Sequence, residues 1–214
     1  MMTKILVLGA HGKIARLATT MLEKDPANQL TLFLRNAQRL ADQASDQVTV
    51  VEGDAGQLAD LKQAMAGIDI VYANLAGSNI EDEARNVVAA MDATGVKRLI
   101  WISTLGIYDE VPGKYGEWNH QQLDGGYLET YAAAAKVIES SDVDYTVIRP
   151  AWLTNHDEID YETTQKGEAF KGTEVSRKSI ADLVTKLVAD PTWSVHASLG
   201  VNKPNTDGDK PAWY

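Results

Sequence analysis

Three small residues near the start of the chain have the spacing of a phosphate-binding turn. Gly9, Gly12 and Ala15 follow a short apolar run and precede a helical segment that extends to about Glu23. Glycine at the first position suits a tight strand-to-helix turn, glycine at the second lets a bound group approach, and alanine lets the helix pack closely. Free N–H groups at the start of such a helix bind a pyrophosphate. The stretch predicts nucleotide binding, with a turn that serves only packing as the alternative.

The elements that must position this turn alternate along the chain. Short apolar runs predict strands, and apolar residues recur at helical spacing between them. The predicted strands span residues 5–8, 29–35, 47–52, 68–74, 97–103 and 145–149, with a seventh edge strand at 195–201. Alternating β and α units of this length indicate a parallel sheet covered by helices on both faces. We therefore expect an α/β fold with a single doubly wound parallel sheet.

The predicted domain covers residues 1–201, and a polar, turn-rich tail covers residues 202–214. Such a segment usually lies on the surface. The aromatic pair Trp213 and Tyr214 leaves a second interpretation open, in which the end of this segment docks onto the domain.

The composition limits the classes of function. The chain has 214 residues, a formal net charge of −10 and no cysteine. The acidic charge argues against nucleic-acid and anionic-membrane partners, because both require a basic face. The lack of cysteine excludes disulfides, thiolate zinc sites and cysteine nucleophiles. The four histidines show no metal-ligand spacing, so we expect no metal site. No apolar run approaches the ~18 residues of a membrane span, and we expect a cytoplasmic protein.

Side chains at the ends of the second and third predicted strands fit a dinucleotide. Arg35, followed by Asn36, occupies the position where a carboxylate would bond the ribose of NAD, and an arginine there fits the 2′-phosphate of NADP. We therefore expect NADP(H), with NAD(H) as the alternative. Asp54, followed by Ala55, has a carboxylate able to bond the adenine amino group, or else is a turn-forming aspartate.

The next two strand ends carry small or hydroxyl-bearing residues. Leu75, Ala76 and Gly77 follow the fourth strand and let the backbone lie against a ribose. Ser103 and Thr104 end the fifth strand, so their hydroxyls are expected at the same crevice. Hydroxyls at strand ends also form turns, and that interpretation stays open.

A long connection over residues 105–126 leaves the same edge of the predicted sheet. It is rich in glycine and contains Tyr108, Tyr115, Trp118 and His120. Connections of this length are uncommon in compact domains and are often functional. A lid over the site and a surface excursion with locally packed aromatics are the two interpretations.

In their order along the chain, from about Ile5 to Val201, the motifs resemble the atypical short-chain dehydrogenase/reductases. These are small NAD(P)H-binding proteins similar to biliverdin IXβ/flavin reductase and to nitrogen-metabolite repression regulators. The stretches that carry the resemblance are residues 9–12, Arg35-Asn36, 53–55, 102–108, Lys136 with Glu139, and 141–150.

The resemblance implies a Rossmann-like sheet with strand order 3-2-1-4-5-6 and an added seventh strand. It also implies specific cofactor contacts. Those contacts are Gly9, Ala10, His11, Gly12, Lys13 and Ile14 for the pyrophosphate, Arg35 with Asn36 for the 2′-phosphate end, Asp54 and Ala55 for adenine, Leu75 to Gly77 and Lys136 for the riboses, and Pro150, Ala151 and Trp152 around the nicotinamide. Ser103 is a further predicted cofactor contact.

The sequence departs from the family at the catalytic pair. Short-chain dehydrogenases place a tyrosine four residues before the lysine, which lowers the pKa of the phenol. Here Ala132 has that position, while Tyr131 and Tyr127 lie about 140° and about 180° around the helix from Lys136 by the ~3.6-residue repeat. Thr104 occupies the catalytic serine position. Thr104 and Lys136 are therefore the remaining catalytic candidates.

A flat conjugated acceptor does not need that pair, because its π-system spreads the charge of a hydride and solvent can supply the proton. We therefore expect an NAD(P)H-dependent reductase of the flavin or quinone type. Trp118 and Trp152 are candidate walls for the acceptor, or ordinary packing residues, and His156 is a candidate proton donor. The second hypothesis is an NADP(H)-sensing regulator that turns nothing over and acts through a protein partner.

Overall fold

The protein is described by a computed structural model that covers residues 2–214. Its strands and helices alternate through most of the chain. In chain order they are β1 Thr3–Leu8, α1 Lys13–Leu22, β2 Asn28–Leu34, the 3₁₀ segment η1 Ala37–Gln43, β3 Val48–Glu52, α2 Leu58–Ala64, β4 Ile70–Ala73, α3 Ile80–Thr94, β5 Arg98–Ile102, α4 Gly113–Leu123, α5 Tyr127–Glu139, β6 Asp144–Pro150, β7 Trp152–Thr154, β8 Glu162–Thr164, β9 Glu174–Ser176, α6 Arg177–Ala189 and β10 Ala197–Asn202.

Eight strands form the main sheet in the order β3-β2-β1-β4-β5-β6-β10-β8. The first seven run parallel, and β8 pairs antiparallel with β10. The predicted order 3-2-1-4-5-6 is confirmed, and each of those predicted strands begins and ends within two residues of an observed one. The order reverses between β1 and β4, so a crevice opens there at the carboxyl edge of the sheet.

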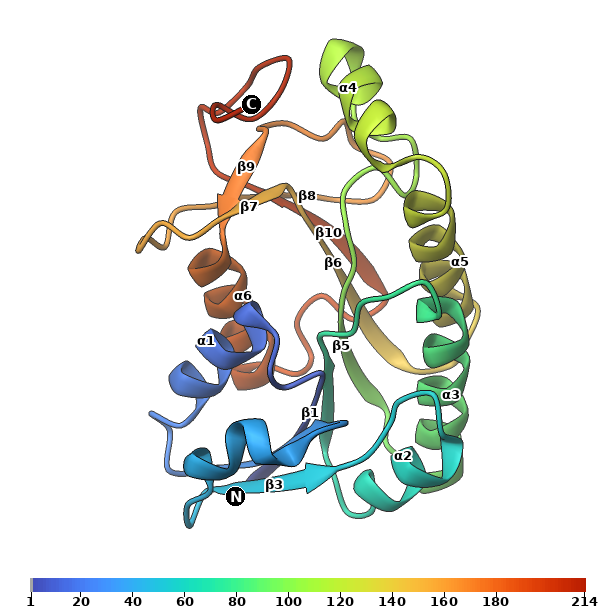
Figure 1. Cartoon of the computed structure of the whole chain (residues 1–214), viewed down its shortest axis with the longest axis vertical. Coiled ribbons are helices and arrows are strands. Elements are labelled where there is room, and N and C mark those ends of the chain that lie inside the picture. The colour runs from blue at the N-terminus through green and yellow to red at the C-terminus, as the bar shows by residue number, and fades with distance from the viewer. Residues whose placement is uncertain (1) are drawn as a thin grey trace.

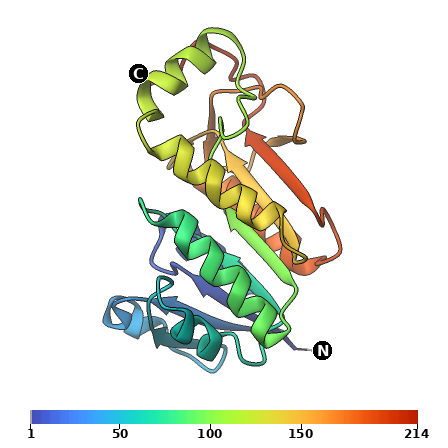
Figure 2. The same cartoon turned by 90° about the vertical axis from the view of Figure 1, so that its right-hand side faces the viewer.

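Helices cover both faces of the sheet, as the continuous apolar run in β1 requires. Ile5 and Val7 point into the core beneath α1 and α6, whereas Leu6 and Leu8 point into the core beneath α2, α3 and α5. Figure 1 shows the two layers on opposite sides of the strands. Figure 2 shows α2, α3 and α5 side by side across the second face. A strand buried on both faces is apolar at every position, and this explains why the run predicted a parallel sheet.

The seventh strand, predicted at the edge of the sheet, is an inner strand in the structure. β8 lies outside it and caps the sheet. A Cβ at Gly200 would lie 2.4 Å from Oγ1 of Thr164, so the glycine is what lets β8 approach. β8 has the sequence Glu-Thr-Thr and gives no apolar signal, so the sequence did not predict it.

The long connection contains helix α4 and is fastened to the sheet by a buried ion pair. Glu110 pairs with Arg149 of β6, and both side chains are almost fully buried. The two carboxylate oxygens of Glu110 also accept hydrogen bonds from the backbone N–H groups of Gly106 and Tyr108, each at 3.0 Å. Glu110 therefore fixes the first half of the connection against β6.

Residues 203–214 lie against β9 and α4, at the β10–β8 end of the molecule with the small β7–β9 sheet (Figure 1). Thr173 donates to the carbonyl oxygen of Thr206 from both its backbone N–H, at 3.1 Å, and its hydroxyl, at 2.7 Å. The ring of Tyr214 contacts the rings of Trp118 and Trp152 at centroid distances of 5.0 and 5.3 Å. Tyr214 thus docks onto the body of the protein.

Candidate functional site

Three adjoining cavities follow the carboxyl ends of the parallel strands. The β2–β4 cavity, of about 440 Å³, lies at the ends of β2, β3 and β4. A middle cavity of about 260 Å³ adjoins it, and the β5–β6 cavity of about 230 Å³ comes next. The first two share Asn74, Leu75 and Ala76, and the last two share Ser103, Tyr127, Leu153 and Arg177. Together the cavities form one groove along the edge of the sheet.

The turn between β1 and α1 lies at the centre of the groove. Gly9 has φ +68°, a left-handed conformation that favours glycine. Gly12 is the N-cap of α1, and no side chain caps the helix there. The first N–H groups of α1 therefore have no side-chain acceptor, which suits an anion.

Of the remaining residues of this turn, some line the groove and one packs into the hydrophobic core. His11 lines the β2–β4 cavity, and Lys13 and Ile14 line the middle cavity. Ala10 is only 1% exposed and its side chain belongs to the core. The backbone N–H of Ala10 donates to the carbonyl oxygen of Phe33 at 3.3 Å, so Ala10 shapes the turn in this structure.

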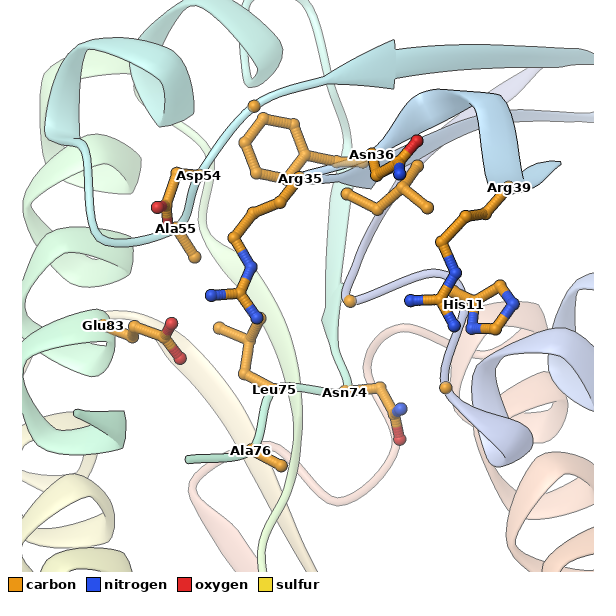
Figure 3. A pocket seen from close by; sticks show the side chains of 15 residues that line it. His11, Arg35, Asn36, Arg39, Asp54, Ala55, Asn74, Leu75, Ala76 and Glu83 are labelled. Atoms are coloured by element: carbon orange, nitrogen blue, oxygen red, sulfur yellow. The ribbon is translucent and has the colours of Figure 1, made fainter. Parts of the chain in front are cut away.

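Two arginines project into the β2–β4 cavity. Figure 3 shows the Arg35 guanidinium between Leu75 and Glu83, and the Arg39 guanidinium beside His11. Neither arginine lies within 4.0 Å of a carboxylate of residues 2–214. Burial, followed by the charges of Arg39 and Arg16, lowers the pKa of His11.

Arg39 was not predicted from the sequence. It lies in η1, four residues beyond Arg35, and one turn of helix-like backbone returns its side chain to the same cavity. Asn36 also lines this cavity, as expected.

Asp54 forms the turn that follows β3. Its Oδ1 accepts the backbone N–H of Gly56 at 2.9 Å. The amide of Asn86 in α3 binds the carbonyl oxygens of Ala55 at 3.3 Å and Gly56 at 3.0 Å, which holds the turn in place. Asp54 and Ala55 both line the cavity, so Asp54 forms the turn and borders the groove as well.

Glu83, in the first turns of α3, is a buried carboxyl in the same cavity. Its Oε1 accepts from the side-chain amide of Asn79 at 3.1 Å. Its Oε2 is buried and has no hydrogen-bond partner among residues 2–214. Burial, helped by the charge of Asp54, raises the pKa of Glu83, while the hydrogen bond from Asn79 and then the charge of Arg35 oppose that shift. Sequence reasoning missed this residue, because an acidic residue early in a helix is normally a dipole-stabilising surface group.

The β5–β6 cavity is lined by hydroxyl and apolar groups. Ser103 and Thr104 are 6% and 8% exposed, and both line it. The Ser103 hydroxyl is buried without a partner in the described chain. Pro150, Ala151 and Trp152 form the opposite wall, so the structure brings these five predicted residues together.

An aromatic cluster holds Trp152 at the wall of this cavity. The indole N–H of Trp152 donates to Oδ1 of the fully buried Asn119 at 3.0 Å. The ring of Trp118 lies 4.8 Å from that of Trp152, and Tyr214 contacts both rings. Trp152 therefore lines the cavity, while Trp118 supports it from behind and does not line it.

Two tyrosines of α5 face the middle cavity, but Lys136 does not. Tyr127 and Tyr131 line it, with their rings stacked at 4.4 Å. Lys136 is exposed, lines none of the three cavities and has no ion-pair partner in the described chain. Five residues of helix turn Lys136 by about 140° from Tyr131, so the face that presents the tyrosines cannot present the lysine. Lys136 therefore lies outside the groove in this structure, and its ribose-binding or catalytic role stays a prediction.

Two further predicted residues do not line the groove. His156 has 66% of its side chain exposed, and its nearest carboxylate is that of Glu158 at 3.7 Å. Gly77 has φ +148°, a Cβ on it would lie 2.8 Å from Oδ1 of Asn79, and it shapes the turn before α3. The proton-donor role suggested for His156 has no support from its position.

Arg177, which was not predicted, lines both the middle and the β5–β6 cavity. It is the first residue of α6, where a positive charge opposes the helix dipole. A positive charge at the expected start of a helix was therefore the feature of the sequence that could have drawn attention to Arg177.

The groove fits a dinucleotide. At its centre it offers a helix start that no side chain caps, and at one end it offers arginines without a carboxylate partner. Toward its two ends, buried oxygen atoms of Glu83 and Ser103 have no hydrogen-bond partner in the described chain. Within residues 2–214, no three His, Asp or Glu side chains are grouped to hold a metal ion. In the same range, no helix has the length and apolar content needed to cross a bilayer.

Comparison with known proteins agrees with this geometry. A family model described as NAD(P)H-binding matches residues 9–191. A Rossmann-fold NAD(P)-binding family protein from Shigella flexneri is 42% identical, with a TM-score of 0.86 over 99% of this chain and 98% of that one. A short-chain dehydrogenase/reductase from Veillonella parvula DSM 2008, solved in complex with NADP, is 29% identical, with a TM-score of 0.91 over 99% and 100% of the two chains.

A curated relative, Quinone oxidoreductase 2 of Escherichia coli strain K12, is 26% identical over 156 residues, which cover 71% of this chain and 50% of that protein. The matched span of the family model includes every strand from β2 to β9 and the whole of the β1–α1 turn. The resemblance to atypical short-chain dehydrogenase/reductases is confirmed, and the chain belongs to the NAD(P)H-binding family.

Proposed function

We propose that this protein is an NADPH-dependent reductase that passes a hydride to a flat conjugated acceptor of the flavin or quinone type. The observation that carries the proposal is the lining of the β5–β6 cavity. It combines an aromatic wall, Trp152, with the hydroxyls of Ser103 and Thr104, and it has no histidine, lysine or carboxylate in it. Tyr127 also lines it, but the residue four positions later is Tyr131, so the lysine that activates the phenol in short-chain dehydrogenases is missing. Such a lining suits an acceptor whose reduction needs no general acid from the protein.

NADPH fits the groove along its length. The β2–β4 cavity would hold the adenosine end, with Arg35 and Arg39 on the 2′-phosphate and the free oxygen of Glu83 within the nucleoside pocket. The start of α1 and Lys13 would hold the pyrophosphate. The NADP complex of the Veillonella parvula protein supports this choice of cofactor.

The nicotinamide supplies the hydride, and the residues around it supply position. Ser103 has a free hydroxyl with which to orient a polar group, and Trp152 is fixed by its hydrogen bond to Asn119. The acceptor would lie flat against Trp152, gain one hydride from NADPH and take its proton from water. The name of the Escherichia coli quinone oxidoreductase supports an acceptor of this kind.

The test is to mix the purified protein with NADPH and a panel of free flavins and quinones, and to follow nicotinamide absorbance at 340 nm. Oxidation of NADPH that saturates with acceptor supports the reductase. Tight NADP(H) binding without turnover across the panel overturns it in favour of the NADP(H)-sensing regulator that acts through a protein partner. A Trp152→Ala variant is the matched comparison, because it removes the wall and leaves the lining of the β2–β4 cavity unchanged.

A further inference from the structure

Arg177 is a cation without a counter-ion at the acceptor end of the groove. Its Nη1 donates to the carbonyl oxygens of Leu153 at 3.1 Å and Thr154 at 3.2 Å, and to Oδ1 of Asn155 at 2.9 Å. All three acceptors are neutral. No carboxylate of residues 2–214 lies within 4.0 Å of this guanidinium. The remaining N–H groups, on Nε and Nη2, are therefore available to a ligand.

The hydrogen bonds of Arg177 leave its charge without a counter-ion. Arg177 is half-buried, and burial lowers its pKa. Its place at the start of α6 sets its charge against the helix dipole, and the helix is already capped by Ser176, whose hydroxyl accepts the backbone N–H of Ser179 at 2.9 Å. The guanidinium contributes nothing to the cap. A partly desolvated, unpaired charge is costly unless something compensates it.

The surrounding cavities are free of negative charge. Neither the middle nor the β5–β6 cavity has an aspartate or glutamate among its lining residues, although the chain has a net charge of −10. The cofactor pyrophosphate already has a site in the uncapped start of α1 with Lys13. Arg177 also reaches the β5–β6 cavity, which Lys13 does not line, and there it shares the wall with Trp152 and Tyr127.

We infer that Arg177 binds an anionic substituent, a phosphate or a carboxylate, on the acceptor, so that the acceptor is a flat conjugated anion. The inference rests on the proposed function, because it assigns the acceptor to the β5–β6 cavity. A guanidinium with two free N–H directions suits a phosphate or carboxylate, which accepts paired hydrogen bonds. FMN and riboflavin form a suitable probe pair, because they share one ring system and differ in a phosphate.

The experiment measures the dissociation constants of FMN and riboflavin from quenching of flavin fluorescence by the NADP⁺-loaded protein. Four proteins are compared: the wild type, Arg177→Gln, Arg177→Lys and Lys178→Gln. Lys178 is the matched control, since it is the next residue and loses the same charge, but its ammonium pairs with Asp157 at 2.5 Å. We expect the wild type to bind FMN at least about 10-fold more tightly than riboflavin, the size of a charge-assisted hydrogen bond.

Arg177→Gln should abolish the preference for FMN over riboflavin, and Arg177→Lys should retain part of it. Lys178→Gln should show the same preference as the wild type. NADP⁺ binding, measured by calorimetry, should be unchanged in all four proteins. Equal binding of FMN and riboflavin by the wild type overturns the inference. So does a loss of NADP⁺ affinity in Arg177→Gln with the flavin ratio intact, because Arg177 would then serve the cofactor phosphates.

The two proposals fail separately. Selective FMN binding without NADPH oxidation would contradict the proposed reductase function and would still support an anion-binding site at Arg177. NADPH oxidation at equal rates and equal KM with FMN and riboflavin would support the reductase and contradict the anion site.

Discussion

Asn74 occupies the space that a side chain at position 12 would need: a Cβ on Gly12 would lie 2.0 Å from Nδ2 of Asn74 and 3.2 Å from the carbonyl oxygen of Gly9. The sequence pattern explained Gly12 by the approach of a bound group. The structure adds that the side chain of Asn74, the residue after β4, fills the space beside Gly12. Both the packing of the turn and the access of a ligand depend on the missing side chain.

Gly12→Ala should therefore push the Asn74 amide into the groove and weaken NADP⁺ binding by about 10-fold or more, while lowering Tm by only a few degrees. Calorimetry and thermal unfolding measure the two effects. The double variant Gly12→Ala/Asn74→Ala should recover much of the affinity, because the colliding amide is gone. Wild-type affinity in Gly12→Ala would contradict this account.

Arg35 and Arg39 should together distinguish NADPH from NADH. Arg35→Ala and Arg39→Ala should each weaken NADPH by roughly 10- to 100-fold, as expected for a hydrogen bond between charged groups, and change NADH by less than about 3-fold. Binding is followed by fluorescence of the reduced nicotinamide. Arg85→Ala is the control, since Arg85 is exposed and pairs with Glu81 of its own helix. An equal loss for both nucleotides would show that neither arginine reads the 2′-phosphate.

Glu83 should make stability depend on pH in a recognisable direction. Because burial raises its pKa, the folded protein holds the Glu83 proton more tightly than the unfolded chain does. Its ionisation therefore costs stability as pH rises from the ordinary carboxyl range through the raised pKa. Glu83→Gln should have a higher Tm than the wild type at pH 7, and the difference should vanish near pH 4. Parallel Tm curves for the two proteins would show that the carboxyl is not penalised by burial.

Tyr214 should act on the acceptor site through Trp152. Tyr214→Ala removes two ring contacts and should raise the KM for the acceptor by about 2- to 10-fold, the value of an aromatic pair, without changing the KM for NADPH. Tyr214→Phe keeps the ring and should behave as the wild type. Acrylamide quenching of tryptophan fluorescence should increase only in the alanine variant. A change in Tyr214→Phe equal to that in Tyr214→Ala would mean that the hydroxyl, not the ring, matters.

Much of the fold could be predicted because the signals are local. The apolar runs of β1 to β6 and the glycines of the first turn indicate a parallel sheet without reference to distant residues, whereas the strand order, and with it the switch point, came from the family resemblance. β8 could not be found this way, since its three polar residues pair only because Gly200 leaves room.

The site was predicted where it lies at strand ends and missed where it lies on helices. Strand ends share one edge by topology, so Arg35 and Ser103 could be assigned from position alone. Arg39, Glu83 and Arg177 depend on how each helix is rotated against the sheet. Lys136 was assigned from a family spacing whose tyrosine is missing here, and the rotation of α5 leaves it outside the three cavities.

The groove is assembled from two stretches of chain that do not overlap at its ends. Residues 9–83 line the β2–β4 cavity, and residues 103–177 line the β5–β6 cavity. On the proposed function, substitutions in the later stretch should change which acceptor is reduced, while binding of the adenosine end of the cofactor should stay the same. Divergence among such proteins should accordingly concentrate after β5, and recombination at that strand offers a direct route to engineered chimaeras.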